Sequence, residues 1–255
     1  MKMIVCGCFG RMGTIVCRLA EENSDMEVAA GIDIVEKAAP YPIYGNINEC
    51  TDNADVIINF MSPKAALSDA LAVVEYSVSR KIPMVVCTTG MPDELENAIK
   101  IAADKVAILR SANMSLGINL LSGLLKHAAK LLYENNFDIE IIEKHHNQKL
   151  DAPSGTALLL ADSVNSSLDG MKYVNDRSQA HEKRERNEIG ISAIRGGTIV
   201  GEHSIIFAGR DEVVEFTHIA HSRDIFAVGA LKAARFIIGK PARLYSMEDI
   251  TGGLT

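Results

Sequence analysis

The sequence predicts an α/β protein whose N-terminal domain is built on a parallel sheet and whose second domain is α+β with a mainly antiparallel sheet. Two observations lead to this class. The first half of the chain alternates short, continuously apolar runs with amphipathic stretches, a pattern typical of parallel strands covered by helices on both faces. After about residue 115, strand-like runs alternate apolar and polar residues, as half-buried strands do.

The elements of the first domain follow one another in strict alternation. Continuous apolar runs predict five strands, and residues at helical spacing between them predict three helices. The strands are expected at 1–7, 26–33, 54–61, 82–90 and 106–114, and the helices at 11–23, 63–81 and 91–105. This order is a nucleotide-binding type of architecture, although a fold alone does not define a function.

The second domain begins with a long amphipathic helix and then becomes rich in strands. Turn signals at Gly196-Gly197 and Gly209-Arg210-Asp211 favour antiparallel pairing. Helices are expected at 115–135, 152–168 and 224–240, and strands at 137–146, 188–197, 200–209 and 211–220. We expect the last helix to return to the first domain, so that the domains are 1–115 with 225–255, and 116–224.

Composition limits the possible functions of this 255-residue chain. The formal net charge of −7 argues against a nucleic-acid partner, which needs a surface with excess Lys and Arg, but allows a basic pocket for a small anion. No run reaches the roughly 18 apolar residues of a membrane span. Five cysteines without a Cys-x-x-Cys pair predict a reduced, cytoplasmic protein with no zinc site.

The first candidate site is the glycine turn "VCGCFGRMG". Gly7, Gly10 and Gly13 follow a strand and open a helix, where glycines allow a dinucleotide pyrophosphate to approach the helix N-terminus. A purely structural glycine turn is the alternative. Asp33 ends the second strand, where a carboxylate can bind the ribose of NAD and repel a 2′-phosphate. With Lys37 as the nearby cation, NADH should be at least as good as NADPH.

Two further segments lie at the ends of predicted strands. Cys87–Gly90, "CTTG", ends the fourth strand and Ser111–Asn119, "SANMSLGIN", follows the fifth. Ligands of open α/β sheets bind at this carboxyl edge, and a glycine there lets a nicotinamide approach the backbone. The alternative for the first segment is an ordinary turn, and the second can serve as a hinge.

The most polar segment is "IIEKHHNQKLDAPSGTAL", residues 141–158. A metal site is disfavoured because adjacent histidines on a strand point to opposite faces. Nucleophilic catalysis by Ser154 lacks the G-x-S-x-G turn. An anion site fits better: a helix that opens with Pro153-Ser154-Gly155-Thr156, capped by Asp151 and with proline in its first turn, offers the backbone N–H groups of Gly155 and Thr156.

Three side chains add proton donors and positive charge beside this helix start: His145, His146 and Lys149. A histidine titrates near neutral pH and can deliver a proton in a transition state. Two later features, Arg195 and "THIAHSR" at 217–223, are interpreted as cross-strand surface pairs.

Taken together, six segments resemble the 4-hydroxy-tetrahydrodipicolinate reductase family, also called dihydrodipicolinate reductase, of the diaminopimelate–lysine pathway. They are "GCFGRMG", "CTTG", "SANMSLGIN", "EKHHNQKLDAPSGTA", "IRGGTIVGEH" and "THIAHSR", in this order over nearly the whole chain. The resemblance implies a Rossmann-type dinucleotide-binding domain at 1–115 and 225–255. It also implies a substrate-binding and oligomerisation domain at 116–224, and a homotetramer built through its sheet.

The resemblance also implies roles for individual residues. His145 would be the proton donor and Lys149 a second catalytic group, while His146, Gly155 and Thr156 would bind the heterocyclic dicarboxylate substrate. No metal is implied. The cofactor positions fall on Gly7, Cys8, Phe9, Gly10, Arg11, Met12, Asp33, Cys87, Thr88, Thr89, Ser111, Ala112, Asn113 and Met114.

Two departures from the family pattern concern the cofactor. The family usually has glycine at the position of Cys87, so the fit there is tighter. Ile34 stands where members that use NADPH well often have arginine, which argues against a strong NADPH preference. The expected activity is NAD(P)H-dependent reduction of 4-hydroxy-tetrahydrodipicolinate, with closure of the domains excluding water. Another nicotinamide-dependent dehydrogenase of amino-acid metabolism and a non-catalytic dinucleotide sensor are the alternatives.

Overall fold

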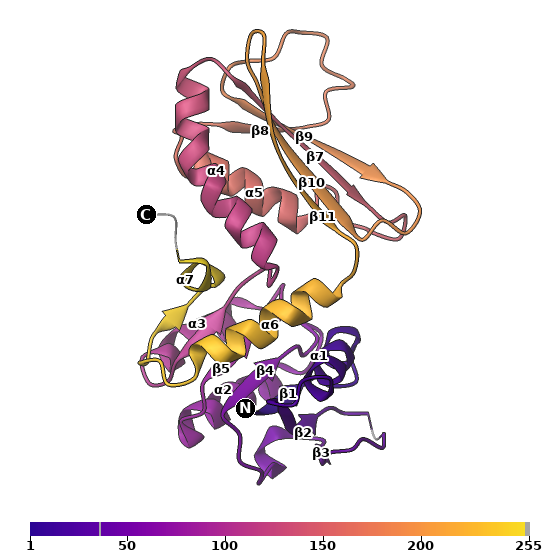
Figure 1. The fold of residues 1–255 in the computed structure, drawn as a ribbon, viewed down its shortest axis with the longest axis vertical. Helices are drawn as coiled ribbons and strands as arrows, with labels where there is room; N and C mark the ends of the chain where they lie inside the picture. The colour runs from indigo at the N-terminus through magenta and orange to yellow at the C-terminus, as the bar shows by residue number, and fades with distance from the viewer. Residues whose placement is uncertain (36, 253–255) are drawn as a thin grey trace. The chain divides into compact units, whose positions relative to one another are not determined.

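The computed structural model describes residues 1–35 and 37–252. It divides into two compact units (Figure 1), the first made of Met1–Ser115 and Asp224–Ile250 and the second containing Leu116–Arg223. The sequence prediction drew the returning segment as 225–255. In the structure it begins one residue earlier and ends at Ile250, and 253–255 lie outside the described residues.

A seven-stranded sheet forms the centre of the first unit, in the order β12-β6-β5-β4-β1-β2-β3, and each neighbouring pair runs parallel. Its strands are β1 (Lys2–Cys6), β2 (Glu27–Ile32), β3 (Ile43–Tyr44), β4 (Val56–Asn59), β5 (Met84–Val86), β6 (Ile108–Arg110) and β12 (Leu244–Tyr245). The predicted parallel sheet is confirmed. The two-residue edge strands β3 and β12 were not predicted, because two residues carry no periodicity.

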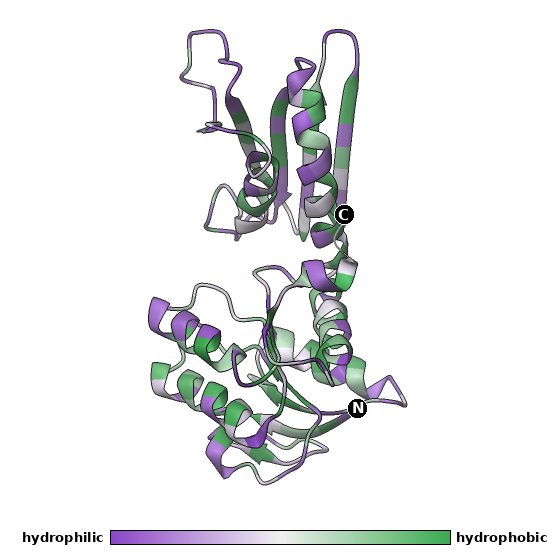
Figure 2. Cartoon of the chain, turned by 90° about the vertical axis from the view of Figure 1, so that its left-hand side faces the viewer, coloured by the Kyte–Doolittle hydropathy of each residue, from purple (hydrophilic) through white to green (hydrophobic). Residues whose placement is uncertain are grey.

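Helices cover both faces of this sheet. Helices α2 and α3 bury one core cluster against it, and α1 packs beside α6 on the other face. Figure 2 shows apolar and polar residues alternating along these helices, as an amphipathic helix requires. Their bounds are α1 (Arg11–Glu21), α2 (Leu67–Arg80), α3 (Asp93–Ala103) and α6 (Asp224–Ile237), with the short α7 (Met247–Thr251) and the 3-10 turn η1 (Ile47–Glu49).

The second unit is a five-stranded sheet, in the order β11-β10-β7-β9-β8, with two helices on one face. Strand β10 pairs antiparallel with β11, as the turn at Gly209-Arg210-Asp211 predicted. The antiparallel pairing across Gly196-Gly197 was predicted wrongly, because β7 lies between β9 and β10: β10 runs antiparallel to β7, and β9 runs parallel to both β7 and β8. The elements are α4 (Leu116–Glu134), β7 (Asp138–His145), α5 (Gly155–Asn165), β8 (Lys172–Asn175), β9 (Glu188–Arg195), β10 (Gly201–Ala208) and β11 (Val213–Ala220).

Strand β7 lies in the middle of this sheet and alternates strictly between its faces. Ile139, Ile141, Glu143 and His145 are buried, and the residues between them are half-buried. The isoleucines join the core formed with α4 and α5. The last two inward positions are therefore polar, and the site of the second unit begins there.

Within the described residues, no helix has the length and apolar character needed to cross a membrane. All five cysteines are buried free thiols.

Candidate functional site

The glycine turn of the first unit lies at the end of β1, which is flanked by β4 on one side and β2 on the other. Chain order runs outward from β1 in both directions, which is the point where open α/β sheets bind ligands. Gly7 has φ +75°, and a Cβ there would lie 2.8 Å from the carbonyl oxygen of Phe60. A Cβ on Gly13 would lie 2.0 Å from the Gly7 carbonyl oxygen, so only glycine permits this close turn.

The turn leads directly into the N-terminus of α1. Gly10 is the N-cap and offers no side chain, and the first turn of the helix contains no acid. The backbone N–H groups in the first turn of α1 and the positive end of the helix dipole are thus available to an anionic ligand. Arg11 adds positive charge at the same place. These residues fit the pyrophosphate of a dinucleotide.

Asp33 follows β2 and is already tied to the glycine turn. Its Oδ2 accepts a hydrogen bond from the Phe9 N–H at 2.9 Å, and its Oδ1 accepts one from the Val35 N–H at 3.1 Å. Lys37 Nζ lies 5.8 Å from the centre of the Phe9 ring, whereas the neighbouring Ile34 is exposed and uncharged. The carboxylate therefore has a defined orientation beside the turn, as the ribose position of a dinucleotide site requires.

The end of β5 supplies the next predicted residues. Cys87 is buried, and its N–H donates to the Asn59 carbonyl oxygen at 2.9 Å. Burial raises the pKa of the Cys87 thiol, so this group is a neutral thiol and a poor nucleophile. The Thr88 hydroxyl donates to the Met61 carbonyl oxygen at 2.9 Å, while Thr89 is exposed.

The end of β4, residues 59–61, therefore belongs to the same edge of the sheet as the predicted residues. Sequence reasoning did not select it. Its signal is positional, because β4 is a buried parallel strand and should deliver its last residues to the carboxyl edge, as β5 does.

Residues 111–114 form a compact turn after β6. The Ser111 hydroxyl donates to the Asn113 carbonyl oxygen at 2.8 Å, and the Asn113 side-chain oxygen accepts from the Ser115 N–H at 2.8 Å. Met114 is buried against α6, where a Cβ on Gly229 would lie 1.7 Å from the Met114 carbonyl oxygen. This packing fixes the backbone from Ser111, through Ala112, to Met114.

In the second unit, His145 closes the inward face of β7. It is 8% exposed, and its Nδ1 lies 2.6 Å from Glu143 Oε2. Because an ionised carboxylate can only accept, this contact places a proton on Nδ1. Nε2 is then the nitrogen left to exchange a proton; a Cβ on Gly201 would lie 3.1 Å from it. The ring of the predicted proton donor is thus buried and held in one orientation.

Glu143, which the sequence prediction missed, is fully buried. It accepts two hydrogen bonds from Arg195, at 2.8 and 2.7 Å, and one from the Ser154 N–H at 2.9 Å. Burial alone would raise the pKa of Glu143, but the hydrogen bonds from Arg195, His145 and Ser154 outweigh it and lower the pKa. The signal in the sequence was a glutamate on the apolar face of an alternating strand, which needs a partner.

Arg195 on β9 forms a cross-strand pair, as predicted, but its partner is the buried Glu143 on β7, so the predicted surface location was wrong. Its guanidinium binds a buried carboxylate and also donates to the Asp151 carbonyl oxygen at 2.7 Å. Arg195 therefore connects the end of β7 with the loop that leads to α5.

Lys149 and Asp151 form an ion pair in that loop, with Nζ 2.9 Å from Oδ1. Burial alone would raise the pKa of Asp151, but the hydrogen bonds from Lys149 and from the backbone N–H of Gly155 have the larger effect. The pKa of Asp151 is therefore lowered. The helix cap was predicted wrongly: Ser154 is the N-cap of α5, and its hydroxyl accepts from the Ala157 N–H at 3.1 Å. The protein's own carboxylate, that of Asp151, therefore lies beside Lys149 and the start of α5.

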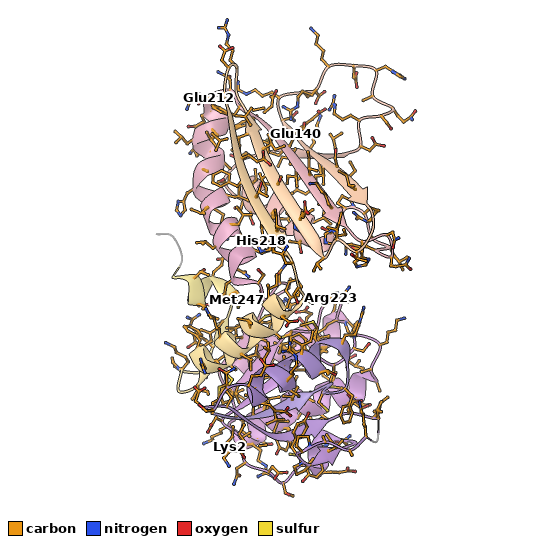
Figure 3. The ribbon with its side chains drawn as sticks, turned by 45° about the vertical axis from the view of Figure 1, so that its right-hand side comes forward. Lys2, Glu140, Glu212, His218, Arg223 and Met247 are labelled. Atoms are coloured by element: carbon orange, nitrogen blue, oxygen red, sulfur yellow. The ribbon has the colours of Figure 1, made fainter. Side chains whose placement is uncertain are left out.

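His146 follows the end of β7 and contacts a second arginine. Its Nε2 lies 3.3 Å from a terminal nitrogen of Arg223, a residue labelled in Figure 3. Desolvation lowers the pKa of His146, and so do the nearby charges of Arg223, His145, Lys149 and Arg195. The interpretation of 217–223 as surface pairs holds for Thr217, which bonds Ser204 across the strands at 2.9 Å, and was wrong for Arg223.

A third histidine, His203 on β10, packs against His145 with ring centres 5.2 Å apart. Its Nε2 lies 3.2 Å from the Ser154 hydroxyl. Burial, followed by the charge of His145, lowers the pKa of His203 to about 4, so its ring is neutral near pH 7. The sequence missed this residue, although it too lies on the inward face of an alternating strand.

The second unit therefore gathers one oriented histidine and a set of cations around the start of α5. Cationic groups and a helix N-terminus suit a ligand with carboxylates. Within residues 1–35 and 37–252, no group of three or more His, Cys, Asp or Glu side chains has the arrangement of a metal site.

Gly155→Ala separates a binding role of the helix start from a structural one. A Cβ at Gly155 would meet nothing within 4 Å, and alanine is favoured over glycine in a helix by about 0.5–1 kcal/mol. We expect unchanged or higher Tm together with a substrate KM raised about tenfold, because a ligand that approaches the backbone N–H would meet the methyl group.

The matched control is Gly45→Ala, where a Cβ also meets nothing within 4 Å. It should leave KM unchanged. An unaltered KM in Gly155→Ala would show that the substrate does not approach this backbone position.

The fold and its two clusters define a two-unit protein that combines a dinucleotide-type glycine turn with a histidine-bearing anion site. Comparison with known proteins shows which family within this class the chain belongs to. The model described as "Dihydrodipicolinate reductase, N-terminus" matches residues 1–114, and the one described as "Dihydrodipicolinate reductase, C-terminus" matches residues 117–251. The chain belongs to the dihydrodipicolinate reductase family.

Individual relatives agree with this assignment. The 4-hydroxy-tetrahydrodipicolinate reductase of Caldanaerobacter subterraneus subsp. tengcongensis is 49% identical over 251 residues, which cover 98% of each chain. That of Clostridium novyi is 47% identical over 250 residues, covering 98% of this chain and 97% of the relative. The solved dipicolinate-bound dihydrodipicolinate reductase of Paenisporosarcina sp. TG-14 has a TM-score of 0.80 at 23% identity, covering 98% and 99% of the two chains, and shares the fold.

Proposed function

We propose that this protein reduces 4-hydroxy-tetrahydrodipicolinate (dihydrodipicolinate) to tetrahydrodipicolinate with NADH or NADPH, in the diaminopimelate and lysine pathway. The chain is a nicotinamide-dependent oxidoreductase by its family. The observation that best supports the reaction is His145, a histidine held by a buried carboxylate that also binds the N-cap residue of α5. Hydride reduction of a dicarboxylate ring needs both a proton donor and cationic groups.

A bound reduced nicotinamide supplies a hydride, which is one hydrogen with two electrons. Residues Gly7 to Met12 would hold its pyrophosphate at the start of α1, and Asp33 would hold the ribose. The turns at Cys87–Thr89 and Ser111–Met114 would hold the remaining part of the cofactor. The free thiol of Cys87 has no chemical step in this scheme.

His145 supplies the proton that accompanies the hydride. Where the substrate carries a hydroxyl group, the hydride replaces that group and the proton leaves with it as water, so one cofactor and one proton are consumed per ring. Lys149 assists while it pairs with a substrate carboxylate. His146, Gly155 and Thr156 bind the carboxylates, which would displace Asp151 from Lys149.

We also propose that the protein is a homotetramer built through the sheet of the second unit. The exposed residues Ile194, Val213 and Ile219 on β9 and β11 support this assembly, because apolar side chains on a sheet are typical of an interface. A cytoplasmic location is supported by the five free thiols.

NADH should be used at least as well as NADPH, since Asp33 repels a 2′-phosphate and Ile34 offers no cation to bind it. Asp33→Asn keeps an acceptor for the Phe9 N–H but removes the charge. We expect the ratio of kcat/KM for NADPH to that for NADH to rise about tenfold or more, equal to about 1.4 kcal/mol. Parallel assays with both cofactors measure this ratio, and an unchanged ratio would contradict the role of Asp33.

The reaction itself is tested by consumption of reduced nicotinamide with a panel of substrates. The panel contains the enzymatically prepared heterocycle and, with oxidised cofactor, amino acids and semialdehydes. The proposal expects turnover with the heterocycle alone. Turnover confined to an amino acid or a semialdehyde would assign the protein to another class of dehydrogenase.

A further inference from the structure

We propose that Glu143 is a positioning residue for the proton donor, and that Arg195 sets how strongly Glu143 acts on it. This inference rests on the proposed function, in which His145 donates the proton. It adds two residues to that step, neither of which touches substrate or cofactor in the proposed scheme.

The first argument is the isolation of the Glu143 carboxylate from water. Its side chain is 0% exposed, and burial of a charge is costly unless hydrogen bonds replace its hydration. Four do so: one from His145, two from Arg195 and one from the Ser154 backbone. A single carboxylate thus joins the proton donor to the first residues of the anion-binding helix.

The second argument is the choice of nitrogen on His145. Because Glu143 Oε2 lies 2.6 Å from Nδ1, the ring keeps a proton on Nδ1 and exchanges the one on Nε2. A histidine whose second nitrogen bonds a carboxylate has a fixed tautomer and ring orientation. His203, packed edge-on at 5.2 Å, restricts the same ring from the side of β10.

The third argument concerns charge. Glu143 holds a negative charge 2.6 Å from the ring that donates the proton. Arg195 donates to both carboxylate oxygens of Glu143 and so partly neutralises this negative charge. Removing the charge of Glu143 and removing the charge of Arg195, each in a separate variant, should therefore shift the pH profile of kcat/KM in opposite directions.

Other titratable or charged groups also face His145, and they come from several elements. Arg195 lies on β9, His203 on β10, and His146, Lys149 and Asp151 in the loop after β7. At pH 7 His203 is neutral, because its pKa is lowered to about 4, and Lys149 is paired with Asp151. Glu143 is the carboxylate in direct contact with the ring.

A buried ion pair that serves only stability would share this geometry, so the test needs measurements that stability does not move. The variants are Glu143→Gln, Glu143→Asp and Arg195→Gln. Glu140→Gln is the control, since Glu140 lies on the same strand and pairs with Arg184. Each variant is assayed for Tm, for kcat and KM separately, and for the pH profile of kcat/KM.

In Glu143→Gln we expect kcat to fall about 100-fold, with KM changed less than about threefold. The alkaline limb of the pH profile should move to lower pH by about one unit. Arg195→Gln should move the same limb to higher pH, Glu143→Asp should recover part of kcat, and Glu140→Gln should match wild type. An unmoved profile in both Glu143→Gln and Arg195→Gln, with losses that follow Tm, would overturn the proposal.

A measurement without substrate keeps this test separate from the proposed function. Nitrogen NMR of histidine-labelled wild-type protein reports the tautomer of His145, with His145→Gln used to assign the signal. The Nδ1–H tautomer is expected, and an Nε2–H tautomer overturns the role of Glu143, even if no variant folds. Lack of turnover with an Nδ1–H tautomer would instead reject the proposed function and leave the geometry intact.

Discussion

His145→Gln should lower kcat by about 10²–10⁴-fold, with KM for the cofactor unchanged. This range is what a positioned general acid contributes. Glutamine still reaches Glu143 by hydrogen bonding, so the buried carboxylate keeps a partner and the protein should fold. The measurement is steady-state turnover beside a thermal unfolding curve.

The control is His181→Gln, because His181 is exposed and lies between β8 and β9. It should retain wild-type activity. Lys149→Ala tests the second catalytic group in the same assay. Near-normal kcat in both His145→Gln and Lys149→Ala, with folding intact, would show that the assigned roles are wrong.

Gly13→Ala should weaken cofactor binding, although alanine normally stabilises a helix relative to glycine by about 0.5–1 kcal/mol. Its Cβ would lie 2.0 Å from the Gly7 carbonyl oxygen and 2.7 Å from the Cys8 Cα, which are backbone atoms and not the end of a flexible side chain. The turn must open, so we expect the Kd for NADH to rise at least tenfold, equal to about 1.4 kcal/mol, and Tm to fall.

Fluorescence titration with NADH measures this effect, with Gly45→Ala as the matched glycine whose Cβ meets nothing within 4 Å. If Gly13→Ala bound NADH like wild type, the glycine turn would not be the pyrophosphate site.

The parts of the fold that could be predicted are those with a long repeating pattern. The helix α4 and the strand β7 carry enough residues for a period of 3.6 or 2 to be visible, and β1 is recognised as a continuous apolar run. The short β12 pairs only through Leu244 and Tyr245, and no pattern can mark such a strand. The parallel pairing of β9 with β7 was also unpredictable, because it depends on a crossover through α5 and β8.

Some residues of the candidate site could likewise be predicted from the sequence, and others could not. The histidines and the turn before α5 were visible as a polar run in one segment of the chain. Glu143 and His203 were not selected, because alternation gives the face of a residue and not its partner. Arg195 lies opposite His145 across β7 and β9, and such a pair depends on the register between strands 50 residues apart.

Errors at the helix cap have a local cause. Asp151 and Ser154 are both favoured N-cap residues, and Asp151 was chosen on the position of Pro153. The structure begins α5 at Gly155, so Ser154 is the residue whose hydroxyl reaches the Ala157 N–H. Asp151 is then left to pair with Lys149.

The central claim is that the chain transfers one hydride to the heterocyclic dicarboxylate and supplies one proton, which leaves with the hydroxyl group as water. The direct measurement incubates wild-type protein with the enzymatically prepared substrate and a limiting amount of NADH, or of NADPH. Oxidised cofactor and tetrahydrodipicolinate, identified by mass spectrometry, are then quantified in the same sample. Equal molar amounts of the two products are predicted. No oxidation of either cofactor, or oxidation without the reduced ring, would contradict the account.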